Sequence, residues 1–155
     1  MSKELEIGDK APDFNLPAST GENLSLKSFK GKTVILYFYP KDDTPGCTTE
    51  ACGFRDELSQ FKKASSVVLG VSNDSVDSHR KFIEKYSLTF PLLADEGHAV
   101  SDQYGVYKEK DMYGKKYWGI ERSTFVIDPE GKIKQIFRKV KVDGHIHEVI
   151  KAIGS

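Results

Sequence analysis

The sequence feature that most constrains the fold is a pair of strongly apolar runs separated by a segment with helical periodicity. Residues 33–39 and 67–71 are rich in β-branched and aromatic side chains, a pattern typical of strands buried on both faces. Between them, apolar side chains recur at spacings of four, three, four and three, at Cys47, Ala51, Phe54, Leu58 and Phe61. That spacing places them on one face of a helix. Strands joined by a helical crossover lie parallel in one sheet.

The rest of the chain continues this alternation of strands and helices. We expect an N-terminal hairpin or irregular layer at residues 7–26 and a helical turn at 28–31. A second amphipathic helix at 76–86 is followed by a short strand at 90–94, whose proline suggests an irregular or edge start. A short helix at 99–104, a hairpin at 123–137 and a last helix at 143–153 complete the chain. Asp143 is the expected cap of the last helix. Residues 106–121 have no clear period and are predicted to form a loop. The order predicts one α/β domain over residues 1–155, with a central mixed β-sheet flanked by helices.

Composition and charge argue against several classes of partner. At 155 residues, the chain has the size of one domain. Lys+Arg and Asp+Glu both number 23, so no net charge favours nucleic acid or an anionic membrane surface. The charged first residues lack the apolar core of a signal peptide, and the apolar runs are far shorter than the ~20 residues that span a bilayer. We therefore expect a cytoplasmic protein. In a reducing cytoplasm, two nearby cysteines are catalytic or metal-binding rather than a permanent disulfide.

The two cysteines of the chain, Cys47 and Cys52, follow a loop at the end of the first apolar run. In open α/β sheets, chemistry takes place beyond the carboxyl ends of strands. Thr44 suits a helix cap and Pro45 the first helical position, which puts Cys47 where the helix dipole and unpaired N–H groups stabilise a thiolate. Two interpretations stay open: a reactive thiolate, or a small buried apolar residue near the beginning of a helix.

A stabilised thiolate is not sufficient for fast chemistry. If the pKa of the thiol fell from ~8.5 to ~6, the thiolate fraction at neutral pH would rise about 30-fold. The thiolate would also become about 10-fold less nucleophilic, so the net gain in rate is only about threefold. The site therefore requires a nearby cation or hydroxyl that polarises the leaving group of the substrate.

The second cysteine lies too far along the helix to bond to the first. Residues five apart in an intact helix have Cα atoms roughly 8–9 Å apart, whereas a disulfide needs them within about 7 Å. A bond between Cys47 and Cys52 therefore requires the helix to unwind. Thr48, Thr49 and Gly53 are poor helix formers, which favours such unwinding. Cys52 is predicted to point away from the buried face of the helix.

The sequence gives little support for a metal site. Two cysteines five apart lack the usual ligand spacing of zinc sites, and His145 and His147 are distant in the sequence. His79 and His98 stand at no helical or triad spacing and are predicted to be solvated or capping residues. We expect no metal and no cofactor.

Several motifs resemble those of a known family. The pattern Pro40-x-x-x-Thr44-x-x-Cys47 resembles the active-site motif of peroxiredoxins, which are cysteine-based peroxidases with a thioredoxin-like fold. Cys52, five residues later, is similar to the second cysteine of the Q-type, or bacterioferritin comigratory protein, subfamily. Further matches lie at residues 70–75, 90–95 and 122–128, so the resemblance spans nearly the whole chain.

The resemblance implies roles for the two cysteines. Cys47 would be the peroxidatic cysteine, attacking the terminal oxygen of a hydroperoxide to give a sulfenic acid. Cys52 would be the resolving cysteine, closing an intramolecular disulfide that thioredoxin then reduces. The implied function is antioxidant defence against hydrogen peroxide and organic hydroperoxides. The subfamily comparison favours a monomer.

The resemblance also implies roles for four other residues. The hydroxyl of Thr44 would orient the peroxide, and Pro40 would shield the sulfenic acid from water. Arg122, which precedes an apolar run, would supply the required cation, the alternative being an ordinary surface charge. Glu50 would either orient Arg122 or cap the helix.

Two other functions compete with the peroxidase. A general disulfide reductase requires a Cys-x-x-Cys pair, which this sequence lacks. A non-enzymatic holdase or redox sensor on the same fold differs from a peroxidase in one measurable respect. Only the peroxidase shows peroxide consumption that is driven by thioredoxin and its reductase.

Overall fold

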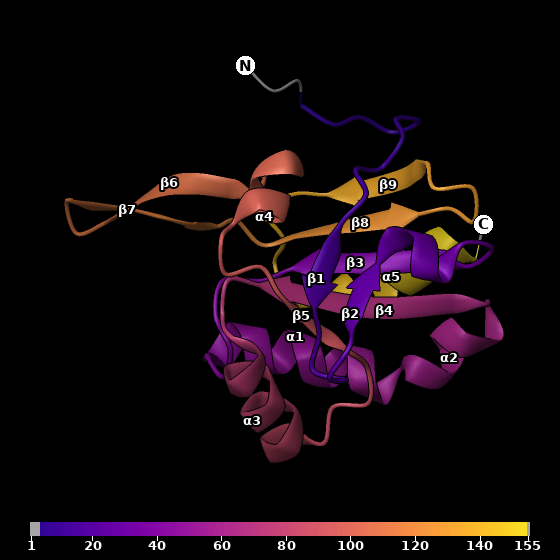
Figure 1. The fold of residues 1–155 in the computed structure, drawn as a ribbon, viewed down its shortest axis with the longest axis horizontal. Coiled ribbons are helices and arrows are strands. Elements are labelled where there is room, and N and C mark those ends of the chain that lie inside the picture. Colours follow the sequence, from indigo (N-terminus) through magenta and orange to yellow (C-terminus); the bar gives the residue numbers. More distant parts are fainter. Residues whose placement is uncertain (1–3, 155) are drawn as a thin grey trace.

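A five-stranded sheet lies at the centre of the computed structural model, which describes residues 4–154 (Figure 1). Its strands, in their order across the sheet, are β5 (Leu92–Ala94), β4 (Ser66–Ser72), β3 (Thr33–Phe38), β8 (Ser123–Ile127) and β9 (Ile133–Phe137). Strands β3, β4 and β5 are parallel, whereas β8 pairs antiparallel with β3 and β9 antiparallel with β8. The predicted mixed sheet is confirmed, with the 90–94 segment forming the expected edge strand.

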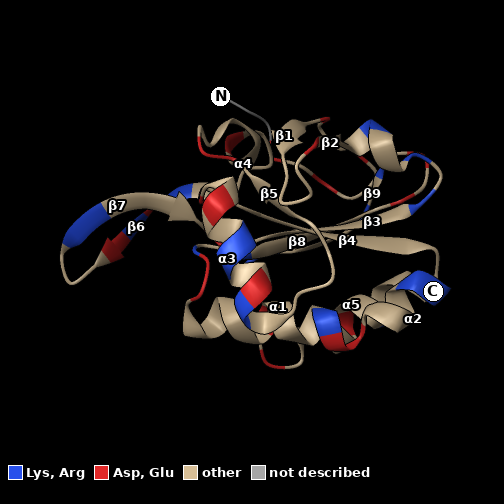
Figure 2. Ribbon diagram, turned by 60° about the horizontal axis from the view of Figure 1, so that its bottom comes forward, with Lys and Arg blue, Asp and Glu red and all other residues tan. Residues whose placement is uncertain are grey.

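Most of the helices cover one face of this sheet, and the N-terminal layer covers the other together with two short helices (Figure 2). The helices are α1 (Pro45–Asp56), α2 (Leu58–Lys63), α3 (Val76–Tyr86), α4 (Ala99–Gln103), α5 (His145–Ile153) and the short 3₁₀ helix η1 (Leu26–Phe29). Apolar residues of α1, α2, α3 and α5 share one buried cluster. A second cluster joins the sheet to the N-terminal segment and to α4. The N-terminal segment contains the predicted hairpin, β1 (Asn15–Pro17) and β2 (Asn23–Ser25).

The central strand β3 supplies both cores, because successive side chains of a strand point to opposite faces. Ile35 and Tyr37 pack under the helices, while Leu36 and Phe38 pack against the N-terminal layer. All four are fully buried. A strand buried on both faces has no polar side, which is why it is a continuous apolar run in the sequence.

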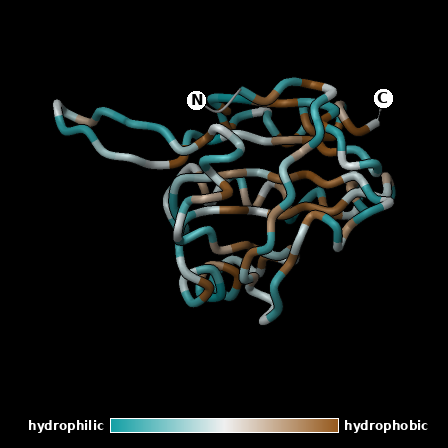
Figure 3. Tube along the Cα trace, turned by 45° about the horizontal axis from the view of Figure 1, so that its top comes forward, coloured by the Kyte–Doolittle hydropathy of each residue, from teal (hydrophilic) through white to brown (hydrophobic). Residues whose placement is uncertain are grey.

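The prediction of a loop at residues 106–121 is wrong. Strands β6 (Tyr107–Met112) and β7 (Lys115–Ile120) form an antiparallel hairpin that projects from the body of the molecule (Figures 1 and 3). Its turn residues Tyr113 and Gly114 both have positive φ, +54° and +80°, as in the tight turns of two-residue hairpins. Both faces of this ribbon are largely exposed, so burial imposes no alternation of polar and apolar residues on its sequence.

Two helix boundaries also differ from the predictions. The predicted apolar face is buried as expected, but it is divided between α1 and α2 by a break at Glu57. The last helix begins after Gly144, which has a φ of +76° and acts as its cap in place of Asp143. Among residues 4–154, no helix has the length and apolar character needed to cross a membrane.

Candidate active site

The loop after β3 delivers Cys47 to the first turn of α1. Thr44 is the N-cap residue, with extended backbone, and Pro45 occupies the first helical position, as predicted from the sequence. Cys47 is therefore the third residue of the helix, among the N–H groups that lack an intrahelical acceptor. Its side chain is only 1% exposed and packs in the cluster beneath the helices. The sulfur thus lies in an apolar setting at the positive end of the helix dipole.

The guanidinium of Arg122 lies next to this sulfur. Its Nη2 donates to Sγ of Cys47 at 3.3 Å, and its Nη1 donates to Oε1 of Glu50 at 2.6 Å. Arg122 immediately precedes β8, and Ser123 pairs in register with Phe38 at the end of β3. Strand pairing therefore brings a residue 75 positions away to the loop that carries the cysteine. Of the two roles considered for Glu50, the structure shows the contact with Arg122.

The charges of this group are strongly perturbed by burial. Glu50 is 0% exposed, and burial raises its pKa to about 7 although Arg122 opposes the shift. Its Oε2 is buried without a hydrogen-bond partner among the described residues. Burial works against the charge of Arg122, but Glu50 and Cys47 raise its pKa above the usual value. Both shifts favour the protonated forms, so the pair tends toward net positive charge beside the sulfur.

Gly46 is a functional position that sequence reasoning missed. A Cβ atom there would lie 3.1 Å from Nη2 of Arg122, closer than ordinary packing allows. The absence of a side chain thus lets the guanidinium reach the sulfur. A glycine in the first turn of a helix, directly before a cysteine, is the signal that could have indicated this close approach.

Thr44 and Pro40 lie in the same loop but are not joined to the sulfur by a recorded contact. Oγ1 of Thr44 donates to the carbonyl of Lys41 at 2.9 Å, which fixes the hydroxyl at the mouth of the helix. Pro40 is exposed at the beginning of the loop. Their roles toward a substrate stay predictions.

Cys52 is a free, half-buried thiol on α1, in contrast to the buried Cys47. The helix between them is continuous, but Oγ1 of Thr49 donates to the carbonyl of Pro45 at 3.0 Å, a bond that weakens and bends helices. Gly53 has a second role besides weakening the helix. Its Cβ would lie 2.7 Å from Cγ1 of Ile146, so the glycine also lets α5 pack closely on α1.

The prediction that His79 is solvated or capping is wrong, whereas His98 is exposed at the N-cap position of α4, without a side-chain capping hydrogen bond. His79 is fully buried on α3, and its Nδ1 lies 2.7 Å from Oδ2 of Asp42. His145 is buried too, with Nε2 2.8 Å from Oγ1 of Thr124. Within the described part of the chain, no group of three or more His, Cys, Asp or Glu side chains is arranged to hold a metal ion.

Comparison with known proteins identifies the family. The model of the AhpC/TSA family matches residues 7–136. A Coxiella burnetii protein named as a peroxiredoxin bcp is 61% identical over 146 residues, covering 94% of this chain and 97% of the relative. Peroxiredoxin Bcp of Bacillus subtilis is 50% identical over 149 residues, covering 96% and 95%. The chain belongs to the Q-type, or Bcp, peroxiredoxins. The family resemblance noted in the sequence is confirmed.

A solved structure shows the same fold for this peroxiredoxin subfamily. The bacterioferritin comigratory protein of Xanthomonas campestris superposes with a TM-score of 0.89 at 46% identity, covering 97% of this chain and 96% of that one. That protein was studied for its alkyl peroxide reduction activity, in complexes with a trapped intermediate and ligand. The predicted thioredoxin-like fold is confirmed. As a peroxiredoxin, the chain is a peroxidase that acts on peroxides and depends on a thiol reductant.

Proposed function

We propose that the enzyme reduces hydroperoxides at Cys47 and recycles through a Cys47–Cys52 disulfide that thioredoxin reduces. The observation that carries this proposal is the 3.3 Å contact between Nη2 of Arg122 and Sγ of Cys47. It joins a thiol at a helix N-terminus to the cation that peroxide chemistry needs. A merely structural buried cysteine has no use for a largely desolvated guanidinium, because removing this charge from water is costly.

In the first step, the thiolate of Cys47 attacks the terminal oxygen of the peroxide. An S–O bond forms and the O–O bond breaks, so the sulfur is oxidised to a sulfenic acid and the peroxide is reduced. The departing alkoxide or hydroxide takes up a proton and leaves as an alcohol or water. Arg122 stabilises both the thiolate and the negative charge that develops on the departing oxygen.

The surrounding residues take the supporting roles implied by the family. The hydroxyl of Thr44 orients the peroxide, and Pro40 limits access of water to the sulfenic acid. Glu50 holds the guanidinium of Arg122 in place through its 2.6 Å hydrogen bond. These assignments are part of the proposal, supported by Thr44 at the N-cap of α1 and by the contacts of Arg122 with Cys47 and Glu50.

In the second step, the thiol of Cys52 attacks the sulfenic sulfur of Cys47. A disulfide forms and water is released. Because both cysteines lie in the continuous helix α1, the first turns of this helix must unwind before the sulfur atoms can meet. A dithiol protein then reduces the disulfide, and we propose thioredoxin for this role.

The proposed cycle bears on assembly, and its dithiol reductant suits a reducing compartment. Both reacting thiols belong to one helix of one chain, so the cycle needs no partner subunit, and we propose a monomer in the cytoplasm. The substrate class includes hydrogen peroxide and organic hydroperoxides, in keeping with the alkyl peroxide reduction of the Xanthomonas campestris relative.

Peroxide consumption with thioredoxin, thioredoxin reductase and NADPH tests the proposal. Cys47→Ser is expected to abolish turnover. Cys52→Ser is expected to consume one equivalent of peroxide and then stop, because no second thiol can resolve the sulfenic acid. Full turnover by Cys47→Ser, or normal recycling by Cys52→Ser, would show that the proposed roles are wrong.

A further inference from the structure

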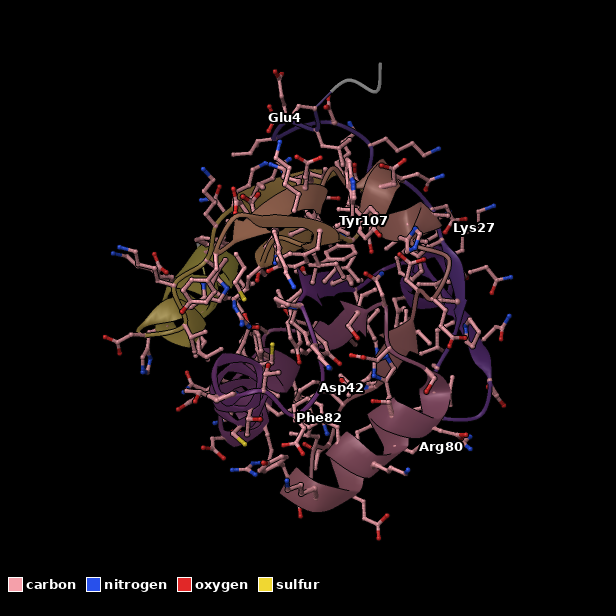
Figure 4. The ribbon with its side chains drawn as sticks, turned by 90° about the vertical axis from the view of Figure 1, so that its left-hand side faces the viewer. Glu4, Lys27, Asp42, Arg80, Phe82 and Tyr107 are labelled. Carbon is pink, nitrogen blue, oxygen red and sulfur yellow. The ribbon has the colours of Figure 1, made fainter. Side chains whose placement is uncertain are left out.

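The loop between Pro40 and Thr44 is tied to α3 by two consecutive aspartates. Asp42 is buried, and its carboxylate accepts three hydrogen bonds. They come from the Tyr39 hydroxyl at 2.5 Å, the Ser78 hydroxyl at 2.8 Å and Nδ1 of His79 at 2.7 Å. Figure 4 shows Asp42 beside α3, near Phe82. The loop that carries the pocket thus has a buried attachment to the beginning of α3.

His79 extends this attachment to the neighbouring strand β5. Its Nε2 lies 2.8 Å from the carbonyl oxygen of Leu93, while its Nδ1 faces the carboxylate of Asp42. A carbonyl oxygen can only accept a hydrogen bond, so Nε2 of His79 carries a proton and donates to Leu93. On its other side, Nδ1 forms a buried hydrogen bond with the carboxyl group of Asp42. Removing either side chain leaves the other buried without this partner, which is costly.

The neighbouring Asp43 is bound to the other end of α3. Its carboxylate accepts from Nζ of Lys85 at 2.8 Å and from the Tyr86 hydroxyl at 2.7 Å, and these bonds hold its pKa below the usual value. Asp43 has a φ of +56°, a left-handed conformation that is rare for residues other than glycine. This attachment is exposed and therefore weaker than that of Asp42.

Helix α3 also holds the chain beyond the two cysteines. Nη1 of Arg55, near the end of α1, donates to the carbonyl of Tyr86 at 2.5 Å. The anchors Asp42 and Arg55 lie on either side of the segment that contains Cys47 and Cys52. The part of the chain that must unwind is thus bounded on both sides by contacts with one helix.

We propose that the buried Asp42–His79 pair is a positioning element, which keeps the pocket loop fixed to α3 while the first turns of α1 unwind and refold. The proposal rests on the disulfide cycle described above. It assigns no contact with substrate to either residue. Its consequence is that Thr44 keeps its position through the cycle, so that the pocket re-forms when Cys47 returns to the helix.

Separate measurement of the two chemical steps tests this role. We would mix reduced enzyme with hydrogen peroxide in stopped and quenched flow, to obtain the rate constant of Cys47 oxidation and that of disulfide formation. Asp42→Asn is expected to slow the oxidation step at least tenfold and to leave disulfide formation unchanged or faster. His79→Asn keeps an N–H group toward Asp42 but loses the bond to Leu93, and should show a smaller loss. His98→Asn, on α4, is the matched control and should keep both rates.

Hydrogen exchange of the unmodified enzyme provides a test that no folding defect can obscure. The amide of Asp42, which donates to Oδ2 of Asp74 at 2.8 Å, is expected to be equally protected in the reduced and the disulfide forms, whereas residues 47–53 lose protection on oxidation. Loss of protection at Asp42 in the oxidised enzyme would overturn the proposal. So would folded Asp42→Asn and His79→Asn variants with normal oxidation rates, or variants in which both steps slow equally. Absence of any Cys47–Cys52 disulfide would instead refute the proposed cycle itself.

Discussion

Gly53 allows the unwinding of α1 to be tested in two opposite directions. An alanine in a helix is favoured over glycine by about 1 kcal/mol, so Gly53→Ala should stabilise the helical form. In the native packing, however, the new Cβ would lie 2.7 Å from Cγ1 of Ile146. Such overpacking costs typically ~1–3 kcal/mol and acts only on the helical form. The two effects oppose each other, and removing the Ile146 side chain separates them.

The expected results therefore depend on the background. In an Ile146→Ala protein, Gly53→Ala should slow disulfide formation about fivefold, because about 1 kcal/mol must be added to the unwinding step. In the native background, the same substitution should leave this step unchanged or faster. The assay is quenched flow after one equivalent of peroxide, with acid trapping and mass analysis of the thiols.

A thermal melt of each reduced variant shows whether the helix was stabilised. If Gly53→Ala raises the stability of the Ile146→Ala protein but leaves its disulfide rate unchanged, unwinding of α1 does not limit the reaction. That result would refute the reasoning. A change only in the rate of Cys47 oxidation would show instead that Gly53 acts on the pocket.

Three further predictions concern the pocket. Arg122→Met should lower kcat/KM for hydrogen peroxide about 100-fold or more, since a charged donor to the developing anion is lost. The kcat/KM of Arg122→Lys should lie between those of the native enzyme and the methionine variant. An unchanged kcat/KM in the methionine variant would show that Arg122 does not have this role. Thr44→Val should cost about 100-fold in the same constant, whereas Thr44→Ser, which keeps the hydroxyl, should retain most of it. Glu50 binds a proton more tightly in the folded state, so stability should fall as pH rises from about 4.5 to about 7. Relative to Glu50→Gln, which cannot ionise, the native protein should lose up to about 3 kcal/mol of its free energy of unfolding over that range. Denaturant unfolding at several pH values measures this difference. If the stabilities of the two proteins changed in parallel with pH, the raised pKa of Glu50 would be contradicted.

The parts of the fold that could be predicted are those in which burial imposes a pattern on the sequence. Strand β3 is a continuous apolar run because both of its faces are covered. The helical face that begins at Cys47 recurs with the helical period for the same reason. The β6–β7 hairpin escaped prediction because neither of its faces is consistently buried. Its one local signal was Gly114 in the turn, a weak indication without flanking alternation.

The site was predictable where chemistry required a particular residue type, and not where it depended on long-range packing. Cys47, at a helix start, and the need for a cation followed from local arguments. The identity of that cation as Arg122 came from the family resemblance, since its approach depends on the pairing of β8 with β3. The burial of His79 could not be foreseen, because its partner Asp42 is 37 residues away. A histidine carries no sign of its burial until its hydrogen-bond acceptors are known.

Peptide mapping under non-reducing conditions tests the central claim most directly. The enzyme would be treated with one equivalent of hydrogen peroxide, blocked with an alkylating reagent and cleaved after glutamate. Because Glu50 lies between Cys47 and Cys52, cleavage there leaves two fragments that only a disulfide can hold together. We predict that these two fragments are recovered linked, without alkylation at either cysteine, and that reduction separates them. Recovery of both cysteines alkylated, or of disulfides only between two chains, would contradict the account.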